Sequence, residues 1–117
     1  MKEQDCMFEK EHEERVLEAM ASMPSEEVVL EMADIFRMLG EPSRLRIVLA
    51  LTKGESCVYH LVEACGGTQS GVSHQLRVLK DNKIVKSRRA GQSVFYSIAD
   101  EHILKMLAIG IEHVDCK

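Results

Sequence analysis

The sequence of 117 residues predicts a mainly α-helical domain with one small β-hairpin. Three observations support this fold class. Apolar residues recur at helical spacing in several segments, as between Glu9 and Met23. Two short helical segments flank the pair Gly66-Gly67, which is the pattern of a helix-turn-helix. Two β-rich runs then flank Ala90-Gly91-Gln92, the pattern of a hairpin. The expected order is helices, helix-turn-helix, hairpin and a last helix, which is that of a winged helix-turn-helix.

Three helices are expected before the glycine turn. The first runs from Glu9 to Met23 and stops at Pro24, which cannot continue a helix. Ser25 is the expected N-cap of the second helix, which ends at Gly40. Pro42 fits the first turn of the third helix. The second helix is expected to bury one apolar face, made of Val29, Met32, Ala33, Phe36 and Leu39.

The helix-turn-helix and the hairpin follow. A short helix fits Cys57 to Ala64, and Thr68 is the expected N-cap of the helix after the glycine turn. The hairpin strands are the alternating run Ile84–Arg88 and the β-rich run Ser93–Ile98. Asp100 then opens a final helix that continues to about His113.

Composition excludes several classes of protein. Apolar residues make up 45% and charged residues 29%, the balance of a folded domain. The longest apolar runs are about five residues, whereas a membrane span needs roughly 20. The N-terminus is acidic and has no apolar core, so it does not read as a signal peptide. We therefore expect a cytoplasmic protein without a membrane partner. No nucleophile with a base and a third orienting group stands out, so an enzyme is not expected.

Charge is unevenly distributed and points to nucleic acid. Residues 1–35 carry eleven acidic and three basic residues, whereas residues 71–98 carry six basic residues and one acidic residue. The second helix of a helix-turn-helix lies in the major groove with its first residues on base edges. The predicted DNA-binding residues of this helix are Gln69, Ser70, Ser73, His74 and Arg77. The hairpin adds cations suited to phosphates or a minor groove, namely Lys86, Arg88 and Arg89.

Four segments of the chain resemble the ArsR/SmtB family of metal-sensing repressors. They are Leu39–Ile47 (LGEPSRLRI), Glu55–Val58 (ESCV), Thr68–Leu76 (TQSGVSHQL) and Gly91–Ser97 (GQSVFYS). The resemblance covers roughly residues 30–113. It implies a homodimeric winged helix-turn-helix that represses an operon, often one for metal efflux, and that leaves DNA when an effector binds. The expected division is an acidic arm with the first helix in residues 1–24, and a winged domain with a C-terminal dimerisation helix in residues 25–117.

The last helix carries donors suited to a divalent transition metal, namely Asp100, His102, His113 and Cys116. Eleven residues separate the two histidines, which places them on one face but about 16 Å apart. A metal with ligands at about 2.0–2.3 Å cannot bridge that gap within one helix. Two copies packed antiparallel would bring Asp100 and His102 of one chain to His113 and Cys116 of the other. Symmetry would then give two equivalent sites.

This spacing resembles the C-terminal-helix site of zinc sensors in the family, with one departure. Cys116 stands where His or Glu is usual, and a thiolate favours softer ions such as cadmium. Asp115 is an alternative fourth ligand. Zn(II) or Cd(II) is the expected effector, with Co(II) and Ni(II) as alternatives. Without a metal, Asp100 is also a natural N-cap, and His113 is favoured near a helix C-terminus.

A second candidate metal site involves Cys57 and His60, which lie three residues apart and share a helix face. The family uses this place for a site completed by the N-terminal arm of the other chain, and Cys6 and His12 are the candidates there. A Cys2His2 set suits tetrahedral zinc or cadmium. Tyr59 replaces the second cysteine of arsenite and lead sensors, which argues against a three-thiolate site. The alternative is that Cys57 is a small core residue and His60 a surface one.

Two other mechanisms remain open at this point. One is a thiol redox sensor without a metal, using Cys57, Cys65 or Cys116. Against it, the sequence has no close cysteine pair, and Cys65 is expected to be a buried free thiol. The other is a constitutive DNA-binding module in which zinc is purely structural, so that a chelator would unfold it.

Overall fold

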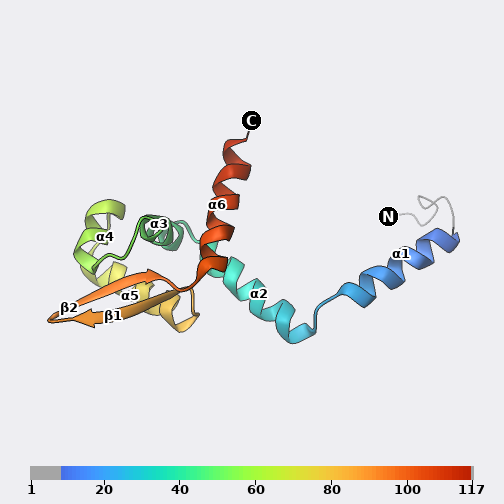
Figure 1. The fold of residues 1–117 in the computed structure, drawn as a ribbon, viewed down its shortest axis with the longest axis horizontal. Coiled ribbons are helices and arrows are strands. Elements are labelled where there is room, and N and C mark those ends of the chain that lie inside the picture. The colour runs from blue at the N-terminus through green and yellow to red at the C-terminus, as the bar shows by residue number, and fades with distance from the viewer. Residues whose placement is uncertain (1–8, 117) are drawn as a thin grey trace. The chain divides into compact units, whose positions relative to one another are not determined.

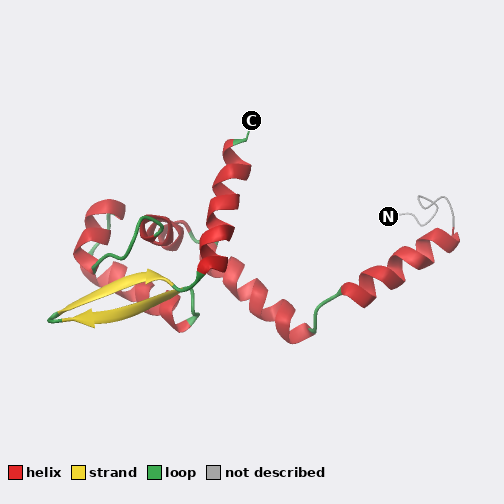
Figure 2. Ribbon diagram, in the orientation of Figure 1, coloured by secondary structure: helices red, strands yellow, loops and turns green. Residues whose placement is uncertain are grey.

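The computed structural model describes residues 9–116, and the chain divides after Met32 into two compact units, residues 1–32 and 33–117. The described part of the chain consists of six helices and one two-stranded sheet. Figure 1 labels these elements, and Figure 2 draws helices in red and strands in yellow. They are α1 Glu9–Ser22, α2 Glu26–Leu39, α3 Pro42–Leu51, α4 Val58–Cys65, α5 Gln69–Asp81, β1 Val85–Ala90, β2 Ser93–Ile98 and α6 Glu101–Asp115. The predicted order of helices, helix-turn-helix, hairpin and helix is confirmed.

The helices before the glycine turn begin where their caps predict. The Ser25 hydroxyl accepts a hydrogen bond from the Val28 N–H at 3.3 Å, which caps α2. Pro42 occupies the first turn of α3, and the carboxylate of Glu41 caps that helix through the Arg44 N–H. In α1, by contrast, no residue is buried.

The prediction that α2 buries its apolar face within a single chain is wrong. Leu39 alone of that face is buried, and Val29 is half-buried. The remaining residues, Met32, Ala33 and Phe36, are exposed. The reason is that the core of the second unit is built from α3 to α6 and the hairpin, with only the end of α2 reaching it. Most of the apolar face of α2 is therefore left exposed by the described residues of its own chain.

The core of residues 33–116 lies beneath the helix-turn-helix. Its fully buried side chains come from α3, α4, α5 and the start of the hairpin, namely Val48, Leu61, Leu76, Leu79 and Ile84. Fully burying such a side chain is worth about 1.5–3 kcal/mol of hydrophobic stabilisation. The second helix of the motif, α5, is thus held by its apolar face, which leaves its polar face toward solvent.

The turn between α4 and α5 depends on two glycines. Gly66 has φ 85° and Gly67 has φ 91°, a region that side chains with a Cβ rarely adopt. Thr68 then caps α5, because its hydroxyl accepts a hydrogen bond from the Gly71 N–H at 3.0 Å. Helix α4 begins one residue later than expected, with Cys57 as its N-cap.

The hairpin pairs β1 with β2 in antiparallel register, Val85 opposite Ile98 and Ala90 opposite Ser93. Gly91, with φ 65°, lies in the turn between the strands. Ser56, in the loop before α4, forms an antiparallel bridge with Tyr96 of β2. The hairpin is therefore attached by main-chain bonds to the body of the domain.

The last helix, α6, starts at its predicted cap. The Asp100 carboxylate accepts a hydrogen bond from the Ile103 N–H at 3.1 Å. Ile103 and Leu107 are buried against the core. Among the residues that the structure describes, no helix is both long and apolar enough to cross a bilayer.

Candidate nucleic-acid interface and metal centre

The polar face of α5 carries the predicted base-reading residues. Val72, Leu76 and Leu79 are buried and fix the helix on the core. The side chains on the opposite side are exposed at Gln69, Ser70, His74 and Arg77, and half-buried at Ser73. Apart from Ser73, the predicted set is thus open to solvent. A helix presented in this way is suited to entering a major groove.

Tyr59 of α4 contacts the start of α5, which the sequence did not predict. The Gln69 side chain donates a hydrogen bond from Nε2 to the Tyr59 hydroxyl at 3.3 Å. Tyr59 is 66% exposed. Helix α4 therefore adds a polar group beside the first residue of α5. The helix-turn-helix spacing alone does not reveal such a contact.

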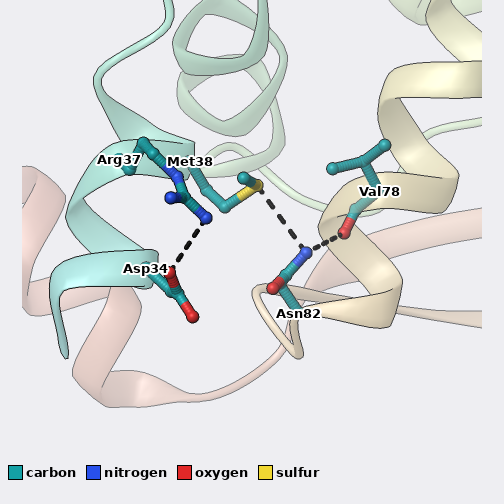
Figure 3. A network of polar contacts seen from close by, with 5 residues as sticks. All are labelled: Asp34, Arg37, Met38, Val78 and Asn82. Carbon is teal, nitrogen blue, oxygen red and sulfur yellow. Dashed lines mark hydrogen bonds and ion pairs between the residues drawn. The ribbon is translucent and has the colours of Figure 1, made fainter. Parts of the chain in front are cut away.

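Arg44 joins the end of α2 to α5. Its Nε donates a hydrogen bond to the Met38 carbonyl at 3.1 Å, and its Nη1 donates to the Gln75 side-chain oxygen at 3.2 Å. The C-terminal end of α2 also contacts the C-terminal end of α5 at Asn82. The Asn82 Nδ2 lies 3.6 Å from Met38 Sδ of α2 and donates a hydrogen bond to the Val78 carbonyl of α5 at 2.8 Å. Figure 3 shows this contact beside the ion pair of Asp34 with Arg37, whose atoms lie 2.9 Å apart.

The three cations of the hairpin are not equivalent. Lys86, Arg88 and Arg89 are all exposed on β1. Arg88 forms two hydrogen bonds with Glu55, one from Nε to Oε2 at 2.9 Å and one from Nη2 to Oε1. The hydrogen bond from Arg88 holds the pKa of Glu55 below its ordinary value, because it favours the ionised carboxylate. The Arg88 guanidinium is thus already paired with a carboxylate of its own chain.

Asp100 and His102 come together at the start of α6. The His102 Nδ1 lies 3.7 Å from Asp100 Oδ1, and both side chains are largely exposed. Asp100 also caps the helix, so it has a structural role that needs no metal. An exposed carboxylate beside an exposed imidazole is a donor pair suited to a divalent cation.

His113 and Cys116 lie at the other end of α6. Cys116 is the C-cap and its N–H donates to the Glu112 carbonyl at 3.0 Å, while the exposed His113 lies in the last turn. Because α6 is continuous from Glu101 to Asp115, helical rise separates the two donor pairs by about 16 Å. Within residues 9–116, a single chain gathers no group of three or more such donors.

An apolar groove lies along α6 and reaches the His113 end. It encloses about 770 Å³. Its walls come from α2, α3 and α6, and include Phe36, Leu39, Leu45, Leu49, Met106 and Ile109. Ile109 is 65% exposed and Val114, also in the groove, is 68% exposed. Open apolar surfaces of this kind are typical of interaction sites.

The second candidate metal set combines residues at the start of α4 with residues of the N-terminal arm of another chain. Cys57 is half-buried at the N-cap of α4, and His60 is exposed on that helix. His12 lies on α1, in the other unit, and Cys6 lies outside the described residues. The proximity of Cys57 and His60 in sequence and the resemblance to the family are the basis for this site, which stays a prediction.

Cys65 is a free thiol, as expected, but it is half-buried and not fully buried. Its Sγ donates a hydrogen bond to the Arg46 carbonyl at 3.5 Å. Partial burial raises the pKa of the Cys65 thiol, with Arg46 acting in the opposite direction. The thiol is one wall of a second, open cavity of about 410 Å³ beside the glycine turn.

Comparison with known sequences finds one family and several related regulators. Residues 41–87 match the family described as bacterial regulatory protein, arsR family. A transcriptional repressor SmtB homolog of Synechocystis is 39% identical over 103 residues, which span 88% of this chain and 78% of that protein. A cadmium resistance transcriptional regulatory protein CadC homolog of Staphylococcus aureus is 30% identical over 103 residues, spanning 87% of this chain and 84% of that one.

Solved structures agree with the fold. The solution structure of apo-NmtR, a regulator known from Mycobacterium tuberculosis, matches with a TM-score of 0.71 and 38% identity over 82% of this chain and 81% of that one. A homodimeric winged helix-turn-helix DNA-binding domain from Mycobacterium bovis matches with a TM-score of 0.72 and 27% identity, over 80% of this chain and 90% of that one. The predicted winged helix-turn-helix is thereby confirmed.

Proposed function

The chain belongs to the ArsR family of bacterial regulatory proteins, and we propose that it is a dimeric repressor that a divalent metal ion releases from its operator. Proteins of this family are DNA-binding transcriptional regulators, so the chain is a regulator and not an enzyme. The observation that carries the proposal is the division of four metal donors between the two ends of one uninterrupted helix, α6.

Binding to DNA uses α5 and the hairpin. The exposed polar residues at the start of α5 are suited to reading base edges in the major groove. The basic hairpin is suited to holding phosphates beside it. Two copies would place two such helices on successive major grooves of a palindromic operator. Because the operator DNA of a bacterial regulator lies in the cytoplasm, the cytoplasm is the proposed location.

A second copy of the chain is the proposed cover of the apolar groove. The groove and the exposed face of α2 leave large apolar side chains in water, among them Phe36, Ile109 and Val114. Burying such area is favourable by about 25 cal/mol per Å². The homodimeric domain from Mycobacterium bovis has the same fold, which supports this assembly.

The dimer would complete the metal site. Asp100 and His102 of one copy would meet His113 and Cys116 of the other, with Asp115 as an alternative to Cys116. Oxygen, nitrogen and sulfur donors together suit Zn(II) or Cd(II), with Co(II) and Ni(II) as alternatives. The relative named for cadmium resistance supports Cd(II). Genes for metal efflux or resistance are the proposed targets.

Release from DNA follows from differential affinity. A metal that joins both copies of α6 favours the dimer geometry in which those helices are held together. If that geometry fits the operator less well, each ligand weakens the other by the same coupling free energy, typically about 1–3 kcal/mol. That range corresponds to roughly 5- to 150-fold in affinity.

The thiol mechanism is less well supported. A redox-sensing cysteine needs thiolate character and access. The raised pKa of Cys65 keeps that thiol protonated near neutral pH. Cys116 is exposed, but it lies at the end of the donor set proposed for the metal.

The test is fluorescence anisotropy on a duplex from the region upstream of the gene. Reduced apo protein is titrated at fixed salt, and stoichiometric Zn(II) or Cd(II) is then added, followed by chelator. We expect tight binding that metal weakens at least five-fold and chelator restores. His113→Ala should bind DNA normally and no longer respond to metal, whereas His60→Ala should respond like the wild type.

Three outcomes contradict the proposal. A His113→Ala dimer that still leaves DNA on metal addition would exclude this site as the switch. Binding that is indifferent to metal but lost with oxidant and recovered with dithiothreitol would favour the thiol mechanism. Unfolding on addition of chelator would make the metal structural.

A further inference from the structure

The basic hairpin contains one cation whose role differs from that of its neighbours. We propose that Arg88 is a positioning residue, held by Glu55, and that Lys86 and Arg89 supply the phosphate contacts of the wing. This inference rests on the DNA binding proposed above. It separates three residues that the sequence places in one basic cluster.

One residue of the loop before α4, Ser56, forms a single antiparallel bridge beside the hairpin. The Ser56 N–H donates to the Tyr96 carbonyl at 2.9 Å, and the Tyr96 N–H donates to the Ser56 carbonyl at 2.8 Å. Ser56 therefore lies on the side of β2 that is opposite β1. Side chains of directly paired residues share a face of a sheet, and successive residues alternate. Since Ser56 pairs with Tyr96, Glu55 and Phe95 both belong to the other face.

Arg88 belongs to that same face and crosses it. It is paired with Phe95 across the hairpin. Its guanidinium carbon lies 5.1 Å from the centre of the Phe95 ring, within cation–π range. Beyond the ring it forms the two hydrogen bonds with Glu55. One side chain thus spans from β1 over β2 to the loop before α4, which fixes the hairpin relative to the body of the domain.

The same contacts make Arg88 a poor phosphate ligand. A guanidinium binds a carboxylate or a phosphate through the same fork of N–H donors, and Glu55 already occupies two of them. The negative charge of Glu55 also offsets the positive charge that Arg88 would present to an approaching phosphate. Among the described residues, neither Lys86 nor Arg89 forms an ion pair. Those two residues therefore contribute the uncompensated positive charge of the wing.

Salt dependence of DNA binding separates the two roles. Each phosphate contact contributes about one unit to the slope of log affinity against log salt. We expect Arg88→Gln to weaken operator binding by about two- to five-fold, as for loss of an exposed ion pair, with the slope unchanged. The matched variants Arg89→Gln and Lys86→Gln should each reduce the slope by about one. A slope reduced by about one in Arg88→Gln would overturn the proposal.

Exchanging the charges tests the same point by rescue. Arg88→Glu should weaken DNA binding, and the double variant Glu55→Arg with Arg88→Glu should recover most of the wild-type affinity and the wild-type slope. If Arg88 instead contacts phosphate, the double variant places a carboxylate against DNA. It would then bind no better than Arg88→Glu, and the positioning role would be wrong.

Hydrogen exchange supplies a readout that does not depend on DNA. In the free protein, the Tyr96 amide hydrogen should exchange faster in Arg88→Gln than in the wild type, because the Ser56 bridge loses its side-chain support. Arg89→Gln should leave that amide unchanged. Equal exchange in wild type and Arg88→Gln would refute the positioning role, even if the protein binds the operator. A wild-type protein that fails to bind the operator would refute the proposed function. The exchange rates of the wild type and Arg88→Gln would still decide whether Arg88 positions the hairpin.

Discussion

Asp100 has an observed capping role and a proposed ligand role, and substitutions can separate the two. Its carboxylate caps α6 through a 3.1 Å hydrogen bond from the Ile103 N–H, and it is the proposed oxygen ligand of the metal. Serine is about as good an N-cap as aspartate but is a much weaker ligand, whereas alanine is neither. Asp100→Ser therefore removes the proposed ligand alone. Asp100→Ala removes the ligand and the cap together.

The cap sets the expected size of the difference. Losing a capping side chain costs about 1 kcal/mol, within a range of about 0.5–2 kcal/mol. For a domain of this size that corresponds to a melting temperature lower by about 4 °C. We expect circular dichroism of the apo proteins, at one protein concentration, to show this loss for Asp100→Ala and little change for Asp100→Ser.

The metal response tests the ligand role. Both variants should bind the operator and remain bound when Zn(II) or Cd(II) is added. A metal response in Asp100→Ser equal to that of the wild type would refute the ligand role. Equal stability of the two apo variants would refute the cap.

Three further predictions follow from other parts of the chain. Leu76→Ala should lower the free energy of unfolding in urea by about 2–5 kcal/mol, because this fully buried side chain attaches α5 to the core; a loss below 1 kcal/mol would contradict that packing. Iodoacetamide at neutral pH should modify Cys116 well before Cys65, whose raised pKa leaves little thiolate, and Zn(II) should protect Cys116; protection of neither thiol would speak against the thiolate ligand. Tyr59→Phe should weaken operator binding only where Gln69 is present, so an additive effect with Gln69→Ala in a double-mutant cycle would show that their 3.3 Å contact is not used.

The backbone of this chain was predictable because its signals are local. Thr68 and Asp100 cap the helices expected of them, and Gly66 adopts the positive φ that a glycine turn needs. Each of these features depends on one residue and its immediate neighbours. Alternating apolar residues and a single glycine likewise located the hairpin. Element boundaries accordingly differ from expectation by only one or two residues.

Contacts between elements were not predictable in the same way. The pairs Glu55 with Arg88 and Arg44 with Gln75 are 33 and 31 residues apart, and no periodicity connects them. The prediction of buried residues in α2 failed for a related reason. Helical spacing shows that Phe36 lies on an apolar face of α2, but it does not show whether that face meets its own chain or a second one. A sequence pattern therefore identifies apolar faces more readily than it identifies what covers them.

The site at the start of α6 shows why cap and ligand are hard to separate from sequence. Both roles call for a short carboxylate next to a helix N-terminus, so Asp100 satisfies either pattern. In the structure the bond to the Ile103 N–H and the approach of His102 both use Oδ1. The second oxygen, Oδ2, takes part in neither. A cation approaching Oδ2 would thus leave the cap in place, and metal binding need not loosen the helix that would carry its effect to the second copy. The two roles are compatible in one side chain, and the serine and alanine variants can divide them.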